Sequence, residues 1–149
     1  MGSVNRYGRP RFIERDGNMT KIEQKPQSEW INILAFYDDL VQEHQWLSAD
    51  PLRKLVHILS RHPSYNQLYP SHSHAILIIS TVSSWPERLD SPHLAISFTG
   101  TCYKYELLDI MFGKPRRLEL GSADSDILFS KIISPLDYLF CAMQEIHEL

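Results

Sequence analysis

The sequence predicts an α+β fold, a single two-layer domain in which helices cover one face of an antiparallel sheet. Two segments in the first half of the chain have apolar residues at helical spacing. Apolar runs of strand length then follow one another, and a further helical segment comes last. An antiparallel sheet whose core face is covered by helices is the simplest way to bury these patterns. The expected order is roughly β-β-α-α-β-β-β-β-α.

Length and composition are those of one globular domain. The chain has 149 residues, of which 43% are hydrophobic and 22% charged, so it can bury a sizeable core without a disulfide or a metal. Its two cysteines, Cys102 and Cys141, do not form a paired framework, and no secretory or membrane-spanning pattern is present. We therefore expect a cytoplasmic protein without a cofactor and without a membrane partner.

The chain changes charge after its first 26 residues. Residues 1–26 hold six basic and three acidic residues, whereas residues 27–149 hold nine basic and fifteen acidic ones. We expect residues 1–26 to be a basic arm or a hairpin that turns at Asp16-Gly17, and residues 27–149 to be the α+β domain. An acidic body argues against nucleic acid and is compatible with a basic protein partner; ordinary solubility charge is the alternative interpretation.

Two helices follow the arm. Helical periodicity extends from about Glu29 to Trp46, with Ser28 as the expected N-cap. A second helix is expected to begin at Asp50 as cap with Pro51 in the first helical position, where the missing N–H costs nothing.

The middle of the chain predicts strands. Residues 75–80 form a continuous apolar run, and residues 93–108 form two alternating runs around Thr99-Gly100, which is typical of a hairpin. The residues "GKP" at 113–115 turn the chain into another strand, "RRLEL". The acidic segment that follows is expected to turn before a helix beginning near Ile127.

The last helix is expected to have Ser134 as its cap. Pro135 would occupy the first helical position, which tolerates a residue without an N–H. Leu136, Leu139, Phe140 and Met143 then form its buried face.

The hairpin over residues 93–108 separates polar from apolar side chains. With a two-residue turn, His93 lies opposite Glu106, and the apolar residues of both strands share the other face. The next strand would place Leu118 and Leu120 inside. The predicted outward face then consists of His93, Lys104, Glu106, Arg117 and Glu119. It is either a solvated face with cross-strand ion pairs or a polar binding surface that no helix covers.

Three aromatic residues flank proline-bearing segments outside any periodic pattern: Tyr65, Tyr69 and Trp85. Aromatic side chains on loops often anchor contacts with a partner. The alternative is that they hold these loops against the core.

Histidines raise the question of a metal or catalytic site. His72 and His74 are two residues apart, so on a strand they would point the same way and could chelate one zinc ion, with His62 or His93 as a further ligand. No Cys-x-x-Cys pair or His-Glu-x-x-His helix supports such a site. A hydrogen-bonding loop is the favoured interpretation, and a histidine-dependent hydrolase or zinc-binding protein using this group is the alternative function.

The sequence therefore favours a non-enzymatic protein-binding module. One concrete version is a small bacterial immunity- or antitoxin-type protein that binds and neutralises a basic partner. It depends on the small size, the acidic body and the lack of an assembled catalytic set.

Overall fold

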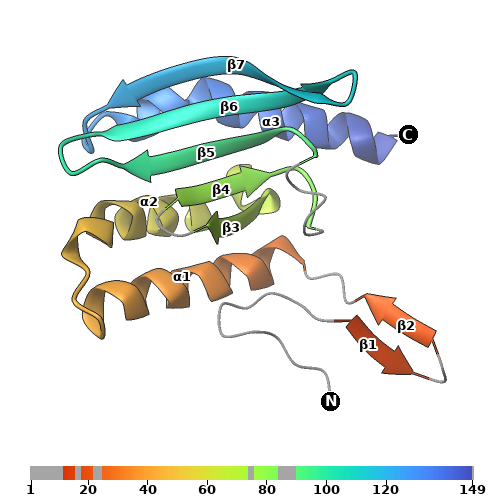
Figure 1. Cartoon of the computed structure of the whole chain (residues 1–149), viewed down its shortest axis with the longest axis horizontal. Coiled ribbons are helices and arrows are strands. Elements are labelled where there is room, and N and C mark those ends of the chain that lie inside the picture. Colours follow the sequence, from red (N-terminus) through yellow and green to blue (C-terminus); the bar gives the residue numbers. More distant parts are fainter. Residues whose placement is uncertain (1–11, 16–17, 22–24, 74–75, 84–89, 149) are drawn as a thin grey trace.

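The computed structural model describes residues 12–15, 18–21, 25–73, 76–83 and 90–148. Its main body is a five-stranded antiparallel sheet in the order β3-β4-β5-β6-β7. Helices α2 and α3 lie behind this sheet, and α1 runs below β3 and packs against both β3 and α2 (Figure 1). The predicted α+β class, with helices on one face of an antiparallel sheet, is confirmed.

The elements in chain order are β1 (Phe12–Arg15), β2 (Asn18–Lys21), α1 (Pro26–Gln42), α2 (Asp50–Arg61), β3 (Tyr69–Ser73), β4 (Ile76–Ser80), β5 (His93–Phe98), β6 (Tyr103–Met111), β7 (Lys114–Ala123) and α3 (Leu128–Glu148). Two short 3₁₀ turns, Leu47–Ala49 and Tyr65–Gln67, precede α2 and β3.

The strands β1 and β2 form a separate two-stranded sheet, in which Arg15 lies opposite Asn18. A hairpin is thus present in the segment where the sequence suggested one. Its expected turn, Asp16-Gly17, and residues 1–11 of the predicted arm lie outside the described residues.

The first helix begins earlier and ends earlier than predicted. Lys25 is extended and Pro26 takes the first helical position, so Ser28 lies within the first turn and is not the cap. The helix ends at Gln42, and Gln45 has a φ of 54°, which an α-helix cannot accommodate. The indole N–H of the buried Trp30 donates to the carbonyl of Leu68 at 3.0 Å, which fastens α1 to the segment that enters β3.

The other two helices also begin differently from the predicted caps. Helix α2 begins one residue earlier than predicted: Ala49 is the N-cap, Asp50 is the first helical residue and Pro51 the second. The Asp50 carboxylate accepts a hydrogen bond from Arg53 Nε at 2.8 Å. Helix α3 begins at Leu128, close to the expected start near Ile127, and runs through Pro135 without a break. The predicted cap at Ser134 is therefore wrong.

One strand was not predicted. Residues Tyr69–Ser73, which were expected to be loop, form β3 at the edge of the sheet, where they pair with β4. The segment contains a proline and four residues with polar groups, so it lacks a strand pattern of its own. An edge position tolerates a proline because one side of the strand has no neighbour.

The hairpin of β5 and β6 keeps its predicted faces but not its predicted pairs. Four residues, Thr99 to Cys102, form the turn, so His93 lies opposite Leu108 and Glu106 lies opposite Ala95. The register moves by two residues. Because side chains alternate with a period of two, the buried set on the helix side is the expected one.

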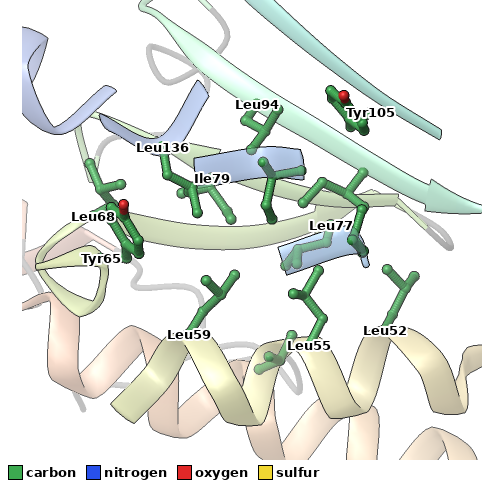
Figure 2. Close-up of a cluster of buried hydrophobic side chains, with 14 of the residues drawn as sticks. Leu52, Leu55, Leu59, Tyr65, Leu68, Leu77, Ile79, Leu94, Tyr105 and Leu136 are labelled. Carbon is green, nitrogen blue, oxygen red and sulfur yellow. The ribbon is translucent and has the colours of Figure 1, made fainter. Parts of the chain in front are cut away.

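The core lies between this face of the sheet and the helices. Leu52, Leu55 and Leu59 project from α2 toward Leu77 and Ile79 of β4 (Figure 2). Leu94 of β5 and Leu136 of α3 close the same cluster. Within the described chain, no helix combines the length and the apolar character that a membrane span requires.

The last strand overturns a prediction. A bulge at Leu118 interrupts the pairing of β6 with β7, so Arg117 lies opposite Leu108 while Glu119 lies opposite Leu107. A bulge inserts one residue and exchanges the faces of everything beyond it. Leu118 and Leu120, expected inside, are both exposed, and Glu119 is on the helix side of the sheet.

Candidate interaction surface

The open part of the sheet is the outer face of β6 and β7, together with the start of β4, which β5 separates from β6. No described helix lies on this side of the sheet (Figure 1). We call its six exposed or half-buried residues the outer face; they are Ile76, Lys104, Glu106, Leu108, Arg117 and Leu120. Strand pairing brings them together, because Leu120 lies opposite Glu106 and Arg117 lies opposite Leu108.

The charged residues of the outer face are partly paired with each other. Arg117 Nε lies 3.3 Å from Glu106 Oε1, on the neighbouring strand. Both side chains are accessible to water, so the pair contributes well under 1 kcal/mol to stability. Lys104 lies between Ser97 and Ser122. Three of the predicted site residues, Lys104, Glu106 and Arg117, are thus brought together as expected.

Leu120, on the edge strand β7, is the most exposed apolar residue of this surface. It remains 57% exposed, beside the ion pair of Glu106 and Arg117. Simple alternation along the sequence predicted Leu120 in the core, because alternation cannot reveal a bulge. A glycine next to it, Gly121, was the only local signal, because glycine within a strand often marks an irregularity or a close approach.

His93 and Glu119 are not part of the outer face. His93 points to that side of the sheet but is 8% exposed, and its Nδ1 is 2.9 Å from the carbonyl oxygen of Ser91. Glu119 faces the helices; burial first, and the neighbouring Glu119 carboxylate next, raise the pKa of Tyr105. The predicted pairing of His93 with Glu106 is wrong.

The aromatic residues hold local structure in place. Tyr65 is buried, its ring stacks on His62 at a centroid distance of 4.2 Å, and its hydroxyl donates to Asp137 Oδ1 at 2.6 Å. Burial and this carboxylate raise the pKa of Tyr65 to about 12. Tyr69 is half-buried at the start of β3 and packs against the core. The structure therefore favours the core-anchoring role for both; Trp85 lies outside the described residues.

The three described histidines of the predicted group, His62, His72 and His93, lie apart from one another. His72 is on the helix side of β3, stacked on Phe36 at a centroid distance of 3.6 Å, whereas His93 is on the opposite side of the sheet. His62 ends α2 and accepts the backbone N–H of Ser64 at 3.3 Å. His74 lies outside the described residues. Across the described ranges, no three His, Cys, Asp or Glu side chains are placed to hold a metal ion.

His57, a histidine outside the predicted group, contacts a carboxylate on another element. His57 Nε2 of α2 lies 3.3 Å from Asp38 Oδ1 of α1, and Arg53 Nη1 is 3.5 Å from the same oxygen. Arg53 also binds Asp50 at 2.7 Å. Partial burial would raise the pKa of Asp50, but its hydrogen bonds with Arg53 and Lys54 outweigh this and lower it. This arrangement is an ion network that joins α1 to α2.

No protein-family model, curated protein or solved structure matches the chain.

Proposed function

We propose that this protein is a non-enzymatic protein-binding module and that its outer face receives the partner. The observation that supports this most directly is Leu120, an apolar side chain left 57% exposed on the edge strand β7, on a sheet face that no described helix covers. Exposed leucines occur singly on many proteins, but this one has charged neighbours of both signs, Lys104, Glu106 and Arg117, around it.

An apolar centre with a polar rim is the usual anatomy of a protein interface. A partner that covers Leu120 gains the free energy of removing it from water, and the charges around it select the partner by complementarity. Glu106 and Arg117 present one acid and one base 3.3 Å apart. A matching partner therefore places a basic group against Glu106 and an acidic group against Arg117.

The immunity- or antitoxin-type version of this proposal requires a basic partner. Its support is the net charge of −6 carried by residues 27–149, together with α1, which contains Glu29, Asp38 and Asp39 but no lysine or arginine. Such a field accelerates the approach of a basic protein without contacting it directly. Affinity for that partner would fall steeply as salt concentration rises.

The proposal is tested with the full chain as bait in a lysate of its own source, followed by quantitative mass spectrometry and binding measurements on the recovered protein. Wild type should retain one partner at a 1:1 ratio. Leu120→Arg should weaken binding at least about tenfold, as expected for a buried interface centre, and Glu106→Lys should weaken it to a smaller extent.

Glu43→Lys is the matched control, because Glu43 is an exposed acid at the end of α1, away from the sheet. It should change the salt dependence slightly and leave the 1:1 complex intact. Circular dichroism melts show that each variant folds. Equal binding by wild type, Leu120→Arg and Glu106→Lys would exclude the outer face as the binding surface.

A further inference from the structure

The turn between β6 and β7 holds an aromatic side chain in an unfavourable place. Phe112 and Gly113 connect the paired residues Met111 and Lys114, and their φ angles are 53° and 75°. Positive φ at both central residues is the type I′ geometry, in which glycine, asparagine and aspartate are preferred. A phenylalanine there is held in a strained backbone conformation, because its Cβ approaches the following carbonyl oxygen. Its side chain is also 99% exposed to solvent.

A pocket of about 240 Å³ lies at the other end of the same hairpin, between α2 and α3. Its walls are mainly apolar and come from Leu55, Ile58, Tyr103, Leu128 and Phe129. An apolar cavity of roughly 150 Å³ is large enough to bind benzene. The pocket therefore has room for one phenyl ring.

The two features cannot meet within one chain. Tyr103 is the first residue of β6 and Met111 is the last, and eight steps of about 3.3 Å separate them along the strand. The β6–β7 turn lies at one end of the sheet, and the start of β6 lies at the opposite end, with the first turn of α3 (Figure 1). Only a second molecule can bring a phenyl ring from this turn to this pocket.

The charges around the two features are complementary. Lys114 and Arg116 follow Phe112 on β7, and both are exposed. Asp126 and Lys54 both line the pocket; Lys54 is paired with Asp50 at 3.3 Å, and Asp124, also exposed, lies two residues before Asp126. Opposite charges at the rim of a contact favour the correct docking orientation.

We propose that copies of this chain associate head to tail, with Phe112 of one copy seated in the pocket between α2 and α3 of the next. The apolar ring leaves water, and Lys114 and Arg116 approach Asp124 and Asp126 of the neighbour. A heterologous contact of this kind produces a ring or an open chain. The outer face is not involved, so this inference is independent of the proposed function.

Sedimentation velocity and light scattering over a range of concentrations test the contact. The average mass of wild type should rise with concentration. Phe112→Asn suits the turn and should abolish association, and Ile58→Trp, at a position 49% exposed beside the pocket, should do so by filling it. A wild type that stays monomeric at every concentration, or a Phe112→Asn variant that associates like wild type, overturns the proposal.

Mixing the two variants is the sharper measurement. Phe112→Asn retains an open pocket and Ile58→Trp retains the ring, so together they should form a 1:1 dimer that grows no further. A mixture that remains monomeric overturns the proposal. Lys114→Glu and Asp126→Lys should each weaken association, and their combination in one chain should restore it. Leu120→Arg is the control, and association lost in that variant but kept in Phe112→Asn would assign the contact to the outer face.

Discussion

Replacing Gly121 with alanine tests the packing on the helix side of the sheet. Gly121 lies opposite Tyr105, and a methyl group at position 121 would lie 2.4 Å from Cζ and from Oη of that tyrosine. Comfortable contacts between such atoms are roughly 3.5–4.0 Å, so the ring would have to move by about 1 Å. Tyr105 is buried, which leaves the ring little freedom to shift.

Two opposing effects determine the result. Overpacking of this kind costs about 1–3 kcal/mol. Removing a glycine restricts the unfolded chain and stabilises by about 0.4–1 kcal/mol where the backbone is compatible. We therefore expect Gly121→Ala to lower the free energy of unfolding by about 1–2 kcal/mol, measured from the midpoint of urea unfolding with an unchanged slope.

The same substitution in a Tyr105→Leu background removes the atoms that clash. Alanine at position 121 should then be neutral or stabilising. Gly113→Ala is the control, because its φ of 75° makes alanine strained although no atom lies within 4 Å, so its cost should be the same in both backgrounds. A Gly121→Ala variant as stable as wild type, or an equal loss in both backgrounds, would refute the packing argument.

Three further substitutions have expected outcomes. Tyr65→Phe should lose about 1–2 kcal/mol, because it removes the 2.6 Å hydrogen bond to Asp137, and the loss should disappear in an Asp137→Ala background. The pKa of Tyr65 is raised to about 12 in the folded protein, whereas it is near 10 in the unfolded chain. The stability that this tyrosine contributes is therefore complete below about pH 10 and is lost as pH rises from about 10 to 12. The free energies of unfolding of wild type and Tyr65→Phe, measured in urea, should become equal across that range. Trp30→Phe should lower the free energy of unfolding by about 1–3 kcal/mol, measured by thermal unfolding, because the Leu68 carbonyl loses its indole donor. Phe112→Asn should raise the free energy of unfolding by roughly 1 kcal/mol at concentrations where the chain is monomeric, and a destabilised variant would contradict the turn assignment.

Local patterns predicted the features that depend on neighbouring residues. The alternation in β5 and β6 correctly separated Leu94 and Ile96 from Lys104 and Glu106, because strand residues alternate between faces whatever their partner strand is. Helical spacing likewise identified α1, α2 and α3, and the Asp50-Pro51 pair marked the start of α2.

Features that depend on a distant partner were missed. β3 has no pattern of its own and is a strand because β4 supplies its hydrogen bonds. Pro135 appeared to be a helix start, yet it lies inside α3, where Leu136 and Leu139 are buried against the core. Tertiary packing outweighs the local cost of a proline in such a helix.

The candidate surface shows the same division. The sequence by itself determined the class of fold, the helical and strand segments and the charged residues of the outer face, since composition and periodicity are local properties. Only the tertiary structure decided that Leu120 is outside, that Glu119 and His72 face the helices, and that His93 is buried. The physical reason is the bulge at Leu118 and the four-residue turn after Phe98: each changes the register by whole residues, and the energy that selects them comes from strand pairing and core burial across the whole sheet.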